Sequence, residues 1–128
     1  MGLFDMFKKK EPRITIPTGP SNAGVYVYDW KRLPKATFLD ELVVDYVPGK
    51  HKMVSSSGNE SITEGALSYK GRIFGCTFHP DAVKKLKAVA KHGPVSCTIV
   101  CTDDEKQYWS LALPRKKEFA DFLKTLDN

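Results

Sequence analysis

The stretch from Ala66 to His92 constrains the fold more than any other part of the chain, because it predicts a β-hairpin that leads into a helix. Residues 66–69 and 72–78 are rich in β-branched and aromatic side chains, which favour strands. Between them, Lys70-Gly71 forms a short connection with a residue that readily adopts positive φ. Two antiparallel strands follow from this pattern.

A helix is predicted at about residues 80–92. Pro80 suits the first helical position, where its missing N–H costs no hydrogen bond, and Gly93 ends the helix. Apolar residues recur at spacings of three and four and form one stripe: Val83, Leu86, Val89 and Ala90. Lysines occupy the opposite side: Lys84, Lys87 and Lys91. The hairpin and helix therefore supply a scaffold with a basic surface.

Composition predicts one domain in the cytoplasm. A chain of 128 residues can bury a core without disulfides or metals. Three cysteines, an odd number, argue against a disulfide framework and for a reducing compartment. We see no secretory signal and no apolar run near the roughly 20 residues that span a bilayer, so we expect no stable membrane insertion. The net charge of +5 allows contact with a polyanion without requiring it.

The chain divides into an N-terminal tail and linker, residues 1–23, and a single domain, residues 24–128. Met1–Lys10 is either a frayed terminus or a short amphipathic segment that touches an anionic membrane weakly and reversibly. The proline-rich linker that follows has room for one short edge strand around Ile14 and Ile16.

The whole pattern predicts an α+β, mostly β fold. Residues 48–65 are polar and read as a long loop, which in a small domain is either functional or disordered. The remaining elements are strands at residues 24–30, 37–47, 95–102 and 107–113 and a C-terminal helix at about residues 115–126. We therefore expect a small curled antiparallel sheet or partial barrel, of the OB or SH3 kind, with two helices packed at its ends.

Metal and catalytic sites are not indicated. Cys97 and Cys101 are four residues apart on a predicted strand, hence about 13 Å at roughly 3.3 Å per residue, which is too far to share a zinc ion. We expect the cysteines to be buried and structural, with no metal and no cofactor. The chain has no glycine-rich phosphate loop, no HExxH motif and no nucleophile elbow. We therefore expect a protein that is not an enzyme.

Aromatic and basic residues form two clusters that suit a single-stranded nucleic acid, because aromatic faces stack on bases and cations meet phosphates. The clusters are Tyr26, Tyr28, Trp30, Lys31 and Arg32 at the first strand, and Tyr69, Lys70 and Arg72 at the hairpin. Strand alternation places Tyr26 and Tyr28 on one face and Val25 and Val27 on the other. The tyrosine face is either a second buried layer or an open platform.

The layout resembles the HIRAN domain, a small β-barrel module found alone in bacteria and attached to helicase-like ATPases elsewhere. Gly24–Tyr28 followed by Trp30–Leu33 is similar to the opening strand of that family, and Ala66-Leu67 to the end of its asparagine-alanine-isoleucine strand. Ile73-Phe74-Gly75, with Ala82, Leu86 and Gly93 after it, is similar to its isoleucine-glycine-tyrosine-proline segment and helix. The resemblance spans about residues 24–113.

The resemblance implies a HIRAN-like β-barrel that binds DNA. Tyr28 matches an aromatic binding position of the family, whereas Ile62 and Thr63 replace part of the asparagine-proline-tyrosine-aspartate segment that holds a single-strand 3′ end. The combined hypothesis is a non-catalytic, cytoplasmic module that binds nucleic acid, with single-stranded DNA as the favoured form. Its contact residues are Tyr28, Trp30, Arg32, Tyr69, Lys70, Arg72, Lys84 and Lys87. The alternative is a protein-interaction or accessory domain with no nucleic-acid role.

Overall fold

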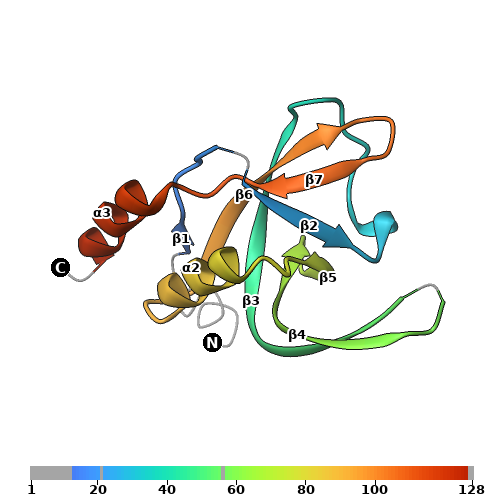
Figure 1. Cartoon of the computed structure of the whole chain (residues 1–128), viewed down its shortest axis with the longest axis horizontal. Helices are drawn as coiled ribbons and strands as arrows, with labels where there is room; N and C mark the ends of the chain where they lie inside the picture. Colours follow the sequence, from blue (N-terminus) through green and yellow to red (C-terminus); the bar gives the residue numbers. More distant parts are fainter. Residues whose placement is uncertain (1–12, 21, 56, 127–128) are drawn as a thin grey trace, which may run out of the picture.

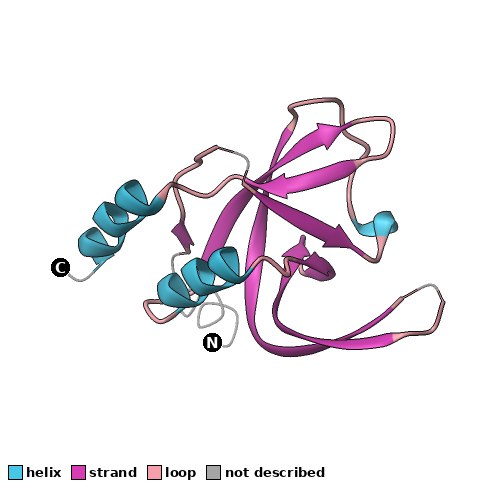
Figure 2. Cartoon of the chain, in the orientation of Figure 1, coloured by secondary structure: helices cyan, strands magenta, loops and turns pink. Residues whose placement is uncertain are grey.

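The computed structural model describes residues 13–20, 22–55 and 57–126 (Figures 1 and 2). Strands dominate, and two α-helices accompany them, as the sequence predicts for an α+β, mostly β fold. The strands are β1 (Ile14–Thr15), β2 (Ala23–Val27), β3 (Glu41–Val54), β4 (Glu60–Tyr69), β5 (Arg72–Cys76), β6 (Val95–Asp103) and β7 (Tyr108–Leu111). The helices are the 3₁₀ turn η1 (Trp30–Arg32), α2 (Pro80–Ala90) and α3 (Lys116–Leu126).

Six of the strands curl into a ring. Their antiparallel pairings run from β6 to β3, β4, β5, β2 and β7, and β7 pairs with β6 again. The short edge strand β1 adds to β6 in parallel. This arrangement confirms the expected curled antiparallel sheet or partial barrel. Alternating side chains point inward and form the core, among them Val27, Val44, Leu67, Phe74, Ile99 and Leu111.

The helix α2 packs against this ring through the predicted apolar stripe. Leu86 and Val89 are fully buried, and Ala82 is buried beside them. Lys85 ties the helix to the segment that leads into α3, because its Nζ donates a hydrogen bond to the carbonyl oxygen of Pro114 at 3.0 Å. The predicted C-terminal helix is also confirmed as α3, which buries Phe119.

The prediction of a long loop at residues 48–65 was wrong. Strand β3 continues to Val54 and β4 begins at Glu60, so these residues form a hairpin that extends beyond the ring (Figure 1). Near its tip, the N–H of Ser55 donates to the carbonyl oxygen of Asn59 at 2.8 Å. The hairpin escaped prediction because most of its side chains are exposed, so it lacks the apolar alternation that marks a half-buried strand.

Two glycines lie where this hairpin bends, beside α2. Gly49 in β3 has φ of 99° and Gly65 in β4 has φ of 87°, a region that glycine adopts without strain. The strand register shifts between Val47 and Lys50, which marks a bulge at the same level. The bend places Lys50 and Glu64, which pair across the two strands, beside the lysine face of α2.

The N-terminal part of the chain also contributes to the packing. Ile16 is fully buried, and its N–H donates to the carbonyl oxygen of Ser96 at 2.9 Å. Arg13 forms an ion pair with Asp45 at 3.0 Å. The amphipathic segment considered for Met1–Lys10 lies outside the described residues. Among the helices that the structure describes, none is long and apolar enough to cross a membrane.

Candidate functional site

A groove runs between α2 and the β3–β4 hairpin. It has a volume of about 610 Å³ and combines exposed apolar side chains with lysines. Ile62 of β4 and Phe78 form its apolar part, with exposed fractions of 71% and 57%. Lys84, Lys87 and Lys91 line its helical side. The groove therefore combines apolar contact surface with positive charge.

Phe78 continues into an aromatic strip on β2. Its ring centroid lies 6.0 Å from that of Tyr26, and the Tyr26 ring stacks on Tyr28 at 6.4 Å. Tyr26 is 41% exposed, whereas Val27 points into the core. Tyr28 is half-buried, and burial raises the pKa of its hydroxyl, with smaller contributions from Cys76 and Asp29. The tyrosine face is therefore an open platform at Tyr26 and a partly covered one at Tyr28.

The backbone fixes Phe78 at the junction of the strip and the groove. Strand β5 pairs with β2 so that Cys76 lies opposite Tyr26, and Phe78 follows two residues later. The hydroxyl of Thr77 donates to the carbonyl oxygen of Gly24 at 2.9 Å. On the other side, the Nδ1 atom of His79 accepts a hydrogen bond from the N–H of Ala82 at 3.4 Å and caps α2. Phe78 is thus held between two anchored segments.

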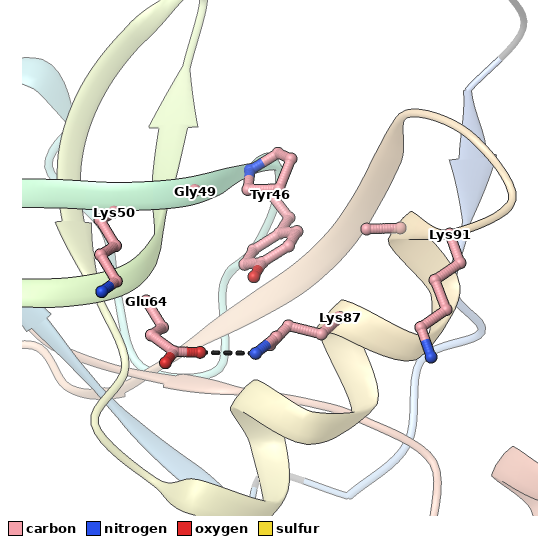
Figure 3. Close-up of a pocket in the computed structure, with 8 residues that line it drawn as sticks. Tyr46, Gly49, Lys50, Glu64, Lys87 and Lys91 are labelled. Atoms are coloured by element: carbon pink, nitrogen blue, oxygen red, sulfur yellow. Dashed lines mark hydrogen bonds and ion pairs between the residues drawn. The ribbon is translucent and has the colours of Figure 1, made fainter.

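A second pocket lies next to the groove, nearer the C-terminal end of α2 (Figure 3). It has a volume of about 450 Å³ and contains Tyr46, Lys50, Glu64, Lys87 and Lys91. The phenol of Tyr46 projects between the hairpin and the helix (Figure 3). The Nζ of Lys87 donates to a carboxylate oxygen of Glu64 at 2.5 Å, and this ion pair borders both the pocket and the groove.

The ion pair sets the charge of both its members. The hydrogen bond and the positive charge of Lys87 lower the pKa of Glu64, and Lys50 lowers it further. The same contact with Glu64 raises the pKa of Lys87. Lys84 and Lys91 form no ion pair within the part of the chain that the structure describes. Both ammonium groups are therefore available to an anion.

Only some of the contact residues that the sequence predicts line the groove. Lys84 and Lys87 line it, as their spacing on the helix allows. Trp30 lies on η1 and is 46% exposed. Arg32 is engaged on the same turn, because its Nε donates to the carboxylate of Asp29 at 2.9 Å.

The second predicted cluster lies at the β4–β5 turn. Tyr69 pairs with Arg72 across the two strands and packs partly against the core. The Nζ of Lys70 lies 5.4 Å from the centroid of the Tyr69 ring, a cation–π contact. Arg72 is exposed. The Tyr69 ring is thus partly covered by the core and by the ammonium group of Lys70, so it is a poor base platform.

Sequence reasoning missed the hairpin side of the site. Lys50 and Glu64 lay in the segment read as a loop, and Phe78 was placed at the end of a strand. The sequence did contain a signal for Lys91, which follows Lys84 and Lys87 on the same helical face. Tyr46 had no such signal, because its role depends on the bend at Gly49 and Gly65.

The cysteines belong to the core, as predicted. Cys76, Cys97 and Cys101 are all buried free thiols. Burial raises the pKa of Cys76 to about 11 and that of Cys97 to about 12. The described residues contain no group of three histidine, cysteine, aspartate or glutamate side chains placed to hold a metal ion.

Comparison of the chain with protein-family models, with curated proteins and with solved structures gave no match. Functional inference therefore rests on the geometry of the groove and on the sequence pattern.

Proposed function

We propose that this protein is a non-catalytic, cytoplasmic module that binds single-stranded nucleic acid, with single-stranded DNA as the favoured form. One observation carries the proposal: the aromatic strip of Tyr28, Tyr26 and Phe78 opens into a groove lined by lysines. Bases stack on exposed aromatic rings without regard to sequence, and ammonium groups neutralise the phosphates between them. Aromatic rings and ammonium groups thus lie next to each other, and this arrangement supports the proposal.

In this proposal, Tyr26 and Phe78 are the principal base platforms, and the ring of Tyr28 stacks against that of Tyr26. The sugar–phosphate backbone of the bound nucleic acid follows α2, where Lys84, Lys87 and Lys91 meet its phosphates. The predicted contacts at Trp30, Arg32, Lys70 and Arg72 extend the surface beyond the strip, and Tyr69 contributes least. The resemblance of residues 24–113 to the HIRAN domain supports a DNA ligand as well.

Fluorescence anisotropy with an internally labelled oligonucleotide tests the proposal. We expect binding at low salt. The logarithm of the affinity should fall linearly with the logarithm of the salt concentration, with a slope of about −0.7 for each phosphate that the protein neutralises on a single strand. Double-stranded DNA of the same sequence is the comparison, because its bases are not free to stack on Tyr26 and Phe78. A lack of binding at low salt, or binding that is indifferent to salt, would contradict the proposal.

A second candidate function is recognition of a protein partner, which the exposed apolar residues of the hairpin favour. Ile62 lines the groove, and Val54 is 51% exposed near the tip. Over residues 50–54 and 60–64, the pairings in the described chain join β3 and β4 only to each other. A labelled acidic peptide that carries apolar residues is the matching probe. If it binds and oligonucleotides do not, this second function replaces the first.

A further inference from the structure

The pocket beside the groove differs from the groove in its chemistry. The groove offers the apolar side chains of Ile62 and Phe78 together with lysines. The pocket offers a phenol, three ammonium groups and one carboxylate: Tyr46, Lys50, Lys87, Lys91 and Glu64. Its remaining lining is Pro48, Gly49 and Ala90, none of which gives an aromatic platform. The pocket therefore offers charged and hydrogen-bonding groups to an anion, and its one aromatic ring, Tyr46, is too deeply buried to stack on a base.

The charge of the pocket suits a dianion. Its described lining carries a net charge of +2, because three lysines face one glutamate. Each internal phosphodiester of a nucleic acid carries one negative charge, whereas a phosphate monoester carries about −1.5 to −2 at neutral pH. A monoester occurs only at the end of a strand. The excess positive charge thus matches a terminal phosphate better than an internal one.

The pocket also holds a fixed hydrogen-bond donor. The Tyr46 side chain is buried and lines this pocket, and its ring lies against Gly65. Figure 3 shows its hydroxyl directed towards the Glu64–Lys87 ion pair. Glu64 is close to Lys50 as well as to Lys87, so it keeps a cationic neighbour when Lys87 turns to another anion. Lys91 lines the same pocket and is not part of this ion pair, so its ammonium group can contact the same anion.

We infer that this pocket binds the terminal phosphate monoester of a nucleic-acid strand whose bases occupy the groove. The inference rests on the proposed function. Lys87 and Lys91 contact the phosphate oxygens, the Tyr46 hydroxyl donates a hydrogen bond to one of them, and Glu64 remains with Lys50. The 5′ and 3′ ends of a strand offer the same chemistry, so the experiment distinguishes them.

The test compares three oligonucleotides of one sequence, each labelled at an internal base. One has hydroxyl groups at both ends, one a 5′-phosphate and one a 3′-phosphate. A charge-assisted hydrogen bond to the added phosphate corresponds to at least about tenfold in affinity. We therefore expect one phosphorylated oligonucleotide to bind about tenfold more tightly than the hydroxyl-ended one, and the tighter of the two identifies the end.

Two variants locate the effect. Tyr46→Phe keeps the ring on Gly65 and removes only the hydroxyl, and Lys91→Gln removes one ammonium. Tyr46→Phe should reduce the preference for the phosphorylated end while the hydroxyl-ended oligonucleotide binds as before. Lys91 lines the groove as well as the pocket, so Lys91→Gln should weaken the hydroxyl-ended oligonucleotide and weaken the phosphorylated one by a larger factor. Lys84→Gln is the matched control, because Lys84 lines the groove and not the pocket. It should weaken all three oligonucleotides by the same factor.

The outcomes distinguish a failure of this inference from a failure of the proposed function. Equal binding of the three oligonucleotides overturns this inference and leaves the proposed function intact. A phosphate preference that survives in the Tyr46→Phe, Lys91→Gln double variant places the terminal phosphate elsewhere and also overturns it. If no oligonucleotide binds, the proposed function and the inference fall together. Circular dichroism melting of each variant shows that the fold is retained.

Discussion

The ring of Tyr46 lies directly on Gly65, so that a Cβ atom at Gly65 would collide with its Cε1, Cζ and Oη atoms. Gly65 has φ of 87° and sits where the β3–β4 hairpin bends. The glycine therefore serves two purposes: it allows the bend and leaves room for the aromatic ring. This contact positions the Tyr46 hydroxyl, and Glu64, the residue before Gly65 in β4, lies opposite Lys87.

Replacement of Gly65 should destabilise the protein more than replacement of another glycine with the same backbone conformation. Gly71→Ala is the matched control, because Gly71 has φ of 80° and open space around its Cα. The left-handed conformation alone costs an alanine about 1–2 kcal/mol. Gly65→Ala should add an overpacking cost of about 1–3 kcal/mol. Urea denaturation of both variants measures the difference, and equal losses would mean that the Tyr46 ring moves freely.

The fold was predictable where its causes are local. The turn at Lys70-Gly71 has positive φ at both residues, 51° and 80°, as the short connection between two strands requires. Pro80 begins α2, and the apolar stripe buries Leu86 and Val89. The outer arm of the β3–β4 hairpin was not predictable, because main-chain pairing holds it together. Met53 is its one buried apolar side chain between residues 50 and 54.

The site was predictable only on its helical side. The spacing of Lys84 and Lys87 already places them on one face of α2. The residues opposite them, Lys50 and Glu64, arrive there through the bend, which depends on packing between distant segments. Phe78 follows β5 without belonging to its alternation, so the pattern gave no indication of its exposure.

The three thiols should be unreactive in the folded protein. Cys76, Cys97 and Cys101 are buried, and the pKa of each is raised by burial. We expect Ellman's reagent at pH 8 to label none of them until denaturant is added, and then all three. Rapid labelling of a native thiol would contradict the burial that the structure shows.

The same thiols make stability fall at alkaline pH. The pKa of Cys97 rises from 9.0 to about 12 on folding, so the folded state holds a proton that the unfolded state has lost. The free energy of unfolding therefore declines as pH rises above 9. Denaturant midpoints measured between pH 8 and pH 10.5 test this, and Cys97→Ala should flatten the decline.

Base stacking should depend on Phe78. Phe78→Ala removes the ring at the junction of the strip and the groove, and loss of one base stack costs about 1–3 kcal/mol of binding. Phe38→Ala is the matched control, because Phe38 is equally exposed and its backbone N–H is bonded to Asp104 near the β6–β7 turn. Anisotropy titrations compare the two, and similar affinities would remove Phe78 from the interface.

The lysines of the groove should determine the salt dependence of binding. Lys84→Gln with Lys91→Gln removes two phosphate contacts, so the slope of log affinity against log salt should become shallower by about 1.4. Lys35→Gln with Lys106→Gln removes the same charge near the contact between Ala36 and Gln107 in the β6–β7 turn. This turn lies on the far side of the ring from α2 (Figure 1). That control should retain the original slope. Equal slopes for the two double variants would argue against phosphate contacts in the groove.

Glu64 should oppose binding, because it places a negative charge among the groove lysines and occupies Lys87. Glu64→Gln should therefore raise affinity for an oligonucleotide severalfold. Acid alone should not reproduce this gain at pH 5, since Lys87 lowers the pKa of Glu64 below its ordinary 4.5 and the carboxylate stays charged there. The stabilising effect of the ion pair is likewise present above pH 4.5 and is lost only as pH falls through the lowered pKa.

Glu60→Gln is the control for Glu64→Gln, because Glu60 pairs with Lys52 at 3.0 Å on the outer part of the hairpin and does not line the groove. Equal gains from both substitutions would show a general effect of net charge, whereas a gain confined to Glu64→Gln assigns the effect to the contact with Lys87.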